Sequence, residues 1–156
     1  MNNAVGIQIK RIKALSFFIN ESLARFDVPY KIEFSHSVSV NDELSLLFFT
    51  LRVFYYYPDK EGKANDLLLD LHVQNVFQVH DFKNYLQEDI TKIALPPDVW
   101  ITIVGLSMSH TRAILAQLTS GTILQDGIFP IMNVPDVAAK FFPDSFKGQF
   151  AELRPS

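Results

Sequence analysis

The chain has 156 residues, no cysteine and a formal net charge of −3. The length suits one domain, and the lack of cysteine excludes disulfides, thiolate zinc sites and a cysteine nucleophile. Nucleic-acid binders normally carry a dense Lys/Arg face, which this charge balance does not predict. Residues 1–13 do not have the pattern of a secretory signal, and no uncharged run approaches the roughly 20 residues of a membrane helix. We therefore expect a cytoplasmic protein with no membrane insertion and no nucleic-acid partner.

The first half of the chain has the period of two that is typical of β-strands. Four strands are predicted, over residues 7–19, 32–40, 44–57 and 67–79. Ile12 falls out of phase in the first strand, which predicts a bulge or bend. The polar residues 41–43 predict a hairpin turn between the second and third strands.

The third predicted strand has two apolar faces of different character. Its odd-numbered positions from Leu47 to Tyr55 are all apolar and are expected to form core, whereas its even-numbered positions interrupt apolar residues with Thr50 and Arg52. A face of this kind is either covered by a partner or exposed for binding. Phe18 in the first strand follows Phe17 directly, so one of the two rings should face outward. The residues that we predict to contact a bound client are Phe18, Leu46, Phe48, Phe54 and Tyr56. The alternative is that a partner subunit or the C-terminal segment buries this face.

Beyond Asp81 the apolar period changes to three and four, which predicts helices. Residues 82–93 read as a short amphipathic helix, and Leu95-Pro-Pro-Asp begins a long one over residues 98–120. Gly121 suits a left-handed cap at its end. A further short helix is predicted over residues 136–142, before a polar tail over residues 144–156. The predicted fold is an α+β domain over residues 1–143: a four-stranded antiparallel sheet, then a long helix packed on one of its faces, then short C-terminal helices.

One face of the long predicted helix carries small side chains, which let another backbone approach closely. That partner is either the sheet or a second copy of the helix. Arg112 lies on the same largely apolar to small helix and is expected to form an ion pair or an interface contact. The predicted oligomer-interface residues are Thr102, Gly105, Ser109 and Arg112.

Three short segments resemble the SecB protein-export chaperone family when they are taken together with the element order. They are His110-Thr-Arg on the long helix, Thr119-Ser-Gly-Thr after it, and Phe129-Pro-Ile-Met-Asn-Val-Pro. The resemblance implies a SecB-like homotetramer, a dimer of dimers with its long helices between two sheets. It also implies binding of unfolded or precursor polypeptides in apolar grooves without ATP or cofactor, and the export translocase motor as a further partner. Residues 123–128 are additional to the family pattern and lengthen the loop after the helix.

Enzyme chemistry finds little support in the residues. None of the four histidines has a partner at metal-ligand spacing, so no metal site and no catalytic residue is predicted. The rival hypothesis is a hot-dog-type enzyme or small-ligand protein, whose central helix normally precedes most strands, whereas here four strands come first. Within the chaperone class, a general export factor and a dedicated partner of one client, such as an antitoxin, both remain open.

Overall fold

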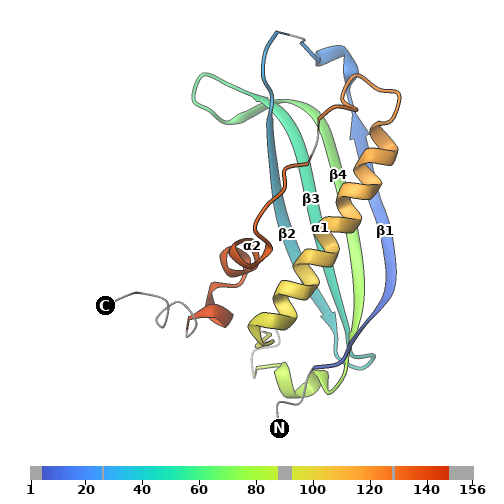
Figure 1. The fold of residues 1–156 in the computed structure, drawn as a ribbon, viewed down its shortest axis with the longest axis vertical. Helices are drawn as coiled ribbons and strands as arrows, with labels where there is room; N and C mark the ends of the chain where they lie inside the picture. Colours follow the sequence, from blue (N-terminus) through green and yellow to red (C-terminus); the bar gives the residue numbers. More distant parts are fainter. Residues whose placement is uncertain (1–4, 26, 88–92, 128, 148–156) are drawn as a thin grey trace.

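The computed structural model describes residues 5–25, 27–87, 93–127 and 129–147 (Figure 1). The four predicted strands are present and form one antiparallel sheet in the order β1-β4-β3-β2. The strands are β1 (Ile7–Ile19), β2 (Lys31–Asn41), β3 (Leu46–Pro58) and β4 (Ala64–Val79). The helices are α1 (Pro97–Thr119) and α2 (Val134–Phe141), with 3-10 turns η1 (Glu21–Leu23), η2 (Phe82–Tyr85) and η3 (Pro143–Phe146). The predicted α+β class is confirmed.

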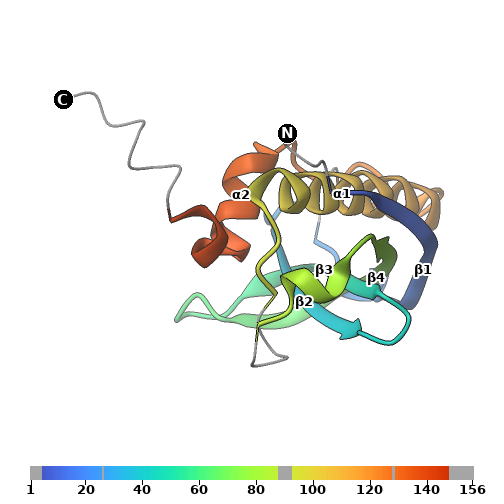
Figure 2. The same cartoon turned by 90° about the horizontal axis from the view of Figure 1, so that it is seen from below.

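The elements form two layers, with α1 and α2 on one face of the sheet (Figure 2). We call this the inner face and the opposite one the outer face. The odd-numbered residues Leu47, Phe49, Leu51, Val53 and Tyr55 of β3 are all 0 % exposed on the inner face, as predicted. From α1, Trp100, Ile103 and Val104 join them in the core. The helix is long and apolar enough to cross a membrane by length and composition, but here its apolar side packs on the sheet.

Strand β1 is irregular at two places. Its pairing with β4 shifts between Ile9 and Arg11 and again between Ala14 and Ser16. The two shifts lie on either side of Ile12, where the sequence predicts a bulge or bend. Each shift is a bulge, which changes the face to which the following side chains point. The β2–β3 hairpin is also present, but Leu44 and Ser45 belong to its turn, where Ser45 has φ 55°.

The long helix agrees with its predicted bounds to within one residue, and Gly121 after it has φ 78°, as a left-handed cap requires. The predicted helix over residues 82–93 is wrong. Among the described residues of this segment, Phe82–Tyr85 form the turn η2, and Leu86 then pairs with Ile93 in an antiparallel bridge. In a helix these two residues would lie about 10 Å apart along the axis, so the bridge and the helix are incompatible. Residues 88–92 lie outside the described residues.

The C-terminal part extends further into the fold than the predicted boundary at residue 143. Turn η3 follows α2 directly, and its Phe146 is 3 % exposed. The indole Nε1–H of Trp100 donates to Ser145 Oγ at 3.1 Å, which ties η3 to the start of α1. The remainder of the predicted tail, from residue 148 onward, lies outside the described residues.

Candidate functional site

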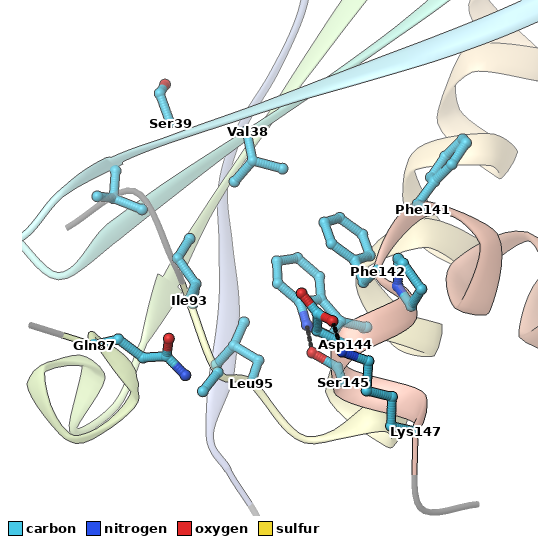
Figure 3. Close-up of a pocket in the computed structure, with 14 residues that line it drawn as sticks. Val38, Ser39, Gln87, Ile93, Leu95, Phe141, Phe142, Asp144, Ser145 and Lys147 are labelled. Atoms are coloured by element: carbon cyan, nitrogen blue, oxygen red, sulfur yellow. Dashed lines mark hydrogen bonds and ion pairs between the residues drawn. The ribbon is translucent and has the colours of Figure 1, made fainter. Parts of the chain in front are cut away.

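A groove of about 850 Å³ opens between β2 and the C-terminal helices at the start of α1 (Figure 3). Val38 and Val40 of β2 and Ile93 and Leu95 before α1 form one side, and aromatic rings form the other. Its volume is within the range of ligand pockets in proteins. The polar groups at its rim include Gln87 and the ion-paired Asp144 and Lys147. The aromatic lining residues are Trp100, Phe141 and Phe142.

Stacked rings build the aromatic wall. Phe142 stacks on Trp100 with ring centroids 3.7 Å apart, and Phe141 stacks on His36 of β2 at 3.9 Å. Phe141 also contacts Phe34 edge-on at 5.8 Å. Helix α2 is therefore attached by one ring to α1 and by its neighbour to β2. Burial lowers the pKa of His36, because the neutral imidazole is favoured where water is excluded.

Local sequence explains why α2 begins where it does. Asn133 is its N-cap, and the side-chain oxygen accepts from the Asp136 N–H at 3.5 Å. Pro135 in the first turn has no N–H to satisfy. Val134 lies so close to α1 that a Cβ added to Gly105 would come within 3.3 Å of it. Gly105 thus permits the close approach of α1 to the chain's own C-terminal segment.

Strand β2 forms an open edge beside this groove. It pairs with β3 on one side, and within the described parts of the chain no strand lies on its other side. Its inner side chains, such as Phe34 and Val38, are half-buried, and the outer ones from Lys31 to Ser39 are exposed. An edge strand has unpaired backbone groups that can accept another strand.

A second pocket, of about 400 Å³, lies near the start of β2 and the end of α1. Ile123 and Leu124, from the additional segment after α1, form part of it. Leu124 is 2 % exposed, and the Ile123 N–H donates to Glu21 Oε1 at 2.8 Å. The Tyr55 hydroxyl donates to the Gly127 carbonyl at 2.6 Å, and its ring stacks on Tyr30 at 5.3 Å. Burial raises the pKa of Tyr55 and of Tyr30, so both phenols stay neutral.

The predicted client-binding residues lie on the outer face in two groups. By register, Leu46 and Phe48 are near one end, whereas Phe54 and Tyr56 of β3 and Phe18 of β1 are near the other. Phe18 is 47 % exposed. Tyr56 is only 2 % exposed, and its hydroxyl donates to Glu33 Oε1 at 2.6 Å.

A charged network separates the two groups. Arg52 donates to both carboxylate oxygens of Asp70, at 2.8 and 2.7 Å, and His72 Nε2 is 3.1 Å from the same carboxylate. The hydrogen bond to Asp70 raises the pKa of Arg52. The Arg52 guanidinium also lies 4.5 Å from the centre of the Phe54 ring and covers part of it.

The predicted interface residues of α1 are of two kinds: two are exposed, and two contact other parts of this chain. Thr102 and Ser109 are exposed on the side of α1 away from the sheet, while Gly105 contacts Val134. Arg112 donates to the Pro130 carbonyl at 3.2 Å and lies 5.4 Å from the centre of the Phe129 ring. Gly105 and Arg112 therefore have contacts inside this chain.

The groove itself was missed at the sequence level. Trp100 of α1 and Val38 of β2 lie far apart in the sequence, and no local pattern predicts a site between them. The available signal is the Phe141-Phe142 pair directly before Pro143, since adjacent rings at a helix end cannot both pack in one direction. No group of three or more potential metal ligands occurs among the described residues.

The architecture is a SecB-like fold: a four-stranded antiparallel sheet, one long helix and short C-terminal helices. The chain is structurally similar to the Mycobacterium tuberculosis SecB-like chaperone Rv1957, solved in complex with a ChAD peptide from the Rv1956 HigA1 antitoxin. The TM-score is 0.55 over 81 % of this chain and 90 % of that chain, at 14 % sequence identity. No protein-family model matches the sequence, and a search of curated proteins finds no significant match. The likeness predicted from the sequence is thus confirmed at the level of the fold.

Proposed function

We propose that this chain is a cytoplasmic, ATP-independent chaperone that binds an extended apolar polypeptide segment in the groove between β2 and α2. The observation that carries the proposal is the position of the groove. An aromatic-walled depression with polar groups at its rim runs directly beside an open strand edge. Surfaces of this kind bind peptides by β-augmentation, in which backbone hydrogen bonds supply affinity and pockets take alternate side chains.

The side chains of β2 define what such a segment would meet. In an added strand, alternate residues point to opposite faces. One set would enter the groove beside Val38 and the Phe141 ring, and the other would pass the small hydroxyls of Ser35, Ser37 and Ser39. We therefore infer a preference for large apolar residues at every second position, with little restriction between them.

The second pocket extends this surface. Tyr30, directly before β2 and at the second pocket, and Val38, in β2 and at the groove, are eight positions apart in the sequence. At about 3.4 Å per residue they are separated by roughly 27 Å. A client segment of about ten residues would therefore span both depressions, and a five-residue peptide would not.

The solved neighbour supports a peptide client, since it binds a peptide of an antitoxin. The proposal has two forms. In one, this chain binds a single dedicated client; in the other, it binds unfolded export precursors and docks on the translocase motor. A homo-oligomer, as a dimer of dimers, belongs to the same proposal, with Thr102 and Ser109 available on the exposed side of α1.

The direct test is suppression of aggregation. Purified protein should delay aggregation of a chemically unfolded protein at near-stoichiometric ratio and without nucleotide. Val38→Lys places a charge in the groove and should weaken this at least tenfold. Leu44→Lys adds the same charge at a turn residue that is 59 % exposed and should have no effect. Failure of the native protein to delay aggregation or bind unfolded chains would remove the proposal.

The form of the client needs a second experiment. Chains captured from the native cell, with the solution mass of the complex, separate the two possibilities. Many secretory precursors would support export, and one partner encoded beside this chain would support the dedicated role. A monomer that captures nothing would contradict both.

A further inference from the structure

The outer face of the sheet is uneven in charge from one end to the other. Around Phe54 and Tyr56 the carboxylates are already engaged, Asp70 by Arg52 and His72 and Glu33 by the Tyr56 hydroxyl. Around Phe48 the pattern is different. The strand register places Arg11 beside Val76 and Lys13 beside Gln74, with Phe48 and Thr50 next in the same two rows.

These two rows contain no acidic residue on any of the four strands. From β1 to β2 they read Arg11, Val76, Phe48, Ser39 and Lys13, Gln74, Thr50, Ser37. Both cations are exposed. Arg11 Nη2 donates to Gln74 Oε1 at 3.2 Å, and among the described residues this is the one side-chain hydrogen bond of Arg11, so other N–H groups of the guanidinium can donate to a ligand. The whole chain has a net charge of −3, so this is a locally basic surface on an acidic protein.

The apolar component is equally local. Val76 is 3 % exposed between Arg11 and Phe48, so its surface is already covered. Phe48 is half-buried and offers the remaining ring surface. We define Arg11, Lys13 and Phe48 as the basic patch.

We propose that the basic patch docks an extended acidic segment of a partner polypeptide, with two carboxylates two residues apart and an apolar side chain beside them. Arg11 and Lys13 lie on one face of β1, and residues two apart in a strand are separated by about 7 Å. An extended acidic segment repeats its side chains at the same distance. The Arg11 guanidinium can donate two hydrogen bonds to one carboxylate, and the apolar side chain would cover the Phe48 ring. This surface lies on the face of the sheet opposite the groove, so its occupation is independent of the proposed function.

The affinity of the basic patch for an acidic segment should have two components, one that depends on salt and one that does not. Exposed charge pairs are weak and are screened by salt, so docking should be modest and should weaken as salt is raised. The apolar contact should supply the part that salt does not remove. Acidic residues alone are therefore insufficient, and acidic residues with an interspersed Phe or Leu are preferred.

The test is fluorescence anisotropy with a labelled peptide that alternates Glu with Phe or Leu, at low and moderate salt. The native full-length chain should bind it, with at least tenfold loss on raising the salt. Arg11→Glu with Lys13→Glu should weaken binding at least tenfold at low salt. The matched control is Lys60→Glu with Lys63→Glu, which makes the same charge change in the exposed β3–β4 turn and should leave binding unchanged.

Three results would overturn the inference. Equal loss in both double variants would show a response to net charge alone. Displacement by an uncharged apolar strand peptide would place the acidic peptide in the groove. Equally tight binding of a single-stranded oligonucleotide would show a general polyanion site. Thermal unfolding of all variants confirms that each is folded.

Discussion

Replacing Phe141 with Ala should separate binding from folding, because this ring joins α2 to β2 and also lines the groove. A fully buried Phe→Ala change costs about 3–5 kcal/mol. Phe141 is half-buried, so about 2 kcal/mol of unfolding free energy should be lost. Proteins of this size have about 5–15 kcal/mol in total, and the variant should stay folded with Tm lower by about 4–8 °C.

The effect on binding follows from the lost wall of the groove. If the ring buries about 60 Å² against a client, at about 25 cal/mol per Å² its removal costs about 1.5 kcal/mol, or roughly tenfold in Kd. The assay is titration of a ten-residue peptide with alternating apolar residues, alongside urea unfolding of the same variant.

Phe17→Ala is the matched control. Phe17 lies on the inner face of β1, is partly buried against the same core, and is at the opposite edge of the sheet from β2. It should lose similar stability and keep its affinity for the peptide. Equal loss of affinity in the two variants would show that Phe141 acts only through stability, and unchanged affinity in Phe141→Ala would exclude the groove as the site.

Three further outcomes are expected. Burial lowers the pKa of His36 below its ordinary value of 6.5, so below pH 6.5 the folded state binds fewer protons at this residue than the unfolded state. The contribution of His36 to stability should be complete above pH 6.5 and should decline as the pH falls below 6.5. Urea midpoints of His36→Gln, measured over the same pH range, should lack this decline. Phe48→Ser should leave the affinity for the groove peptide unchanged and should weaken binding of the alternating Glu/Phe peptide in the anisotropy titration; loss of groove-peptide affinity would show that the outer face binds the client. Gly127→Ala should lower Tm by several degrees in a thermal melt, because a Cβ at this position would lie 2.9 Å from the Tyr55 ring. Gly62→Ala is the control: its Cβ would meet open space, so the variant should lose only the stability that the backbone strain of its φ of 82° costs.

The parts of the fold that follow from local pattern were predictable from the sequence. The odd positions of β3 and the bounds of α1 depend on residues close in the chain, and each carries a clear period. The helix expected over residues 82–93 failed because the pairing of Leu86 with Ile93 overrides its amphipathic period.

Burial on the outer face was harder to predict for a similar reason. The pairing of β3 with β4 shifts between Tyr55 and Tyr56, so Leu68 becomes an extra residue that is fully buried, and Tyr56 itself is covered. A period of two cannot reveal a bulge on the partner strand. The groove needs still more information, since His36, Trp100 and Phe141 meet only after the chain folds back on itself.

The open edge of β2 also bears on edge-to-edge association of two copies of this chain. A free strand edge accepts any compatible strand, including the same edge of another molecule. Here the exposed side chains along β2 are Lys31, Glu33 and three serines, so two such edges placed together would gain almost no apolar contact on the outer side. On the inner side Phe34 is already engaged with Phe129 and Phe141 of its own chain. Pairing is therefore stabilised only when the incoming strand supplies its own large apolar side chains, which distinguishes a client segment from a second copy of this chain.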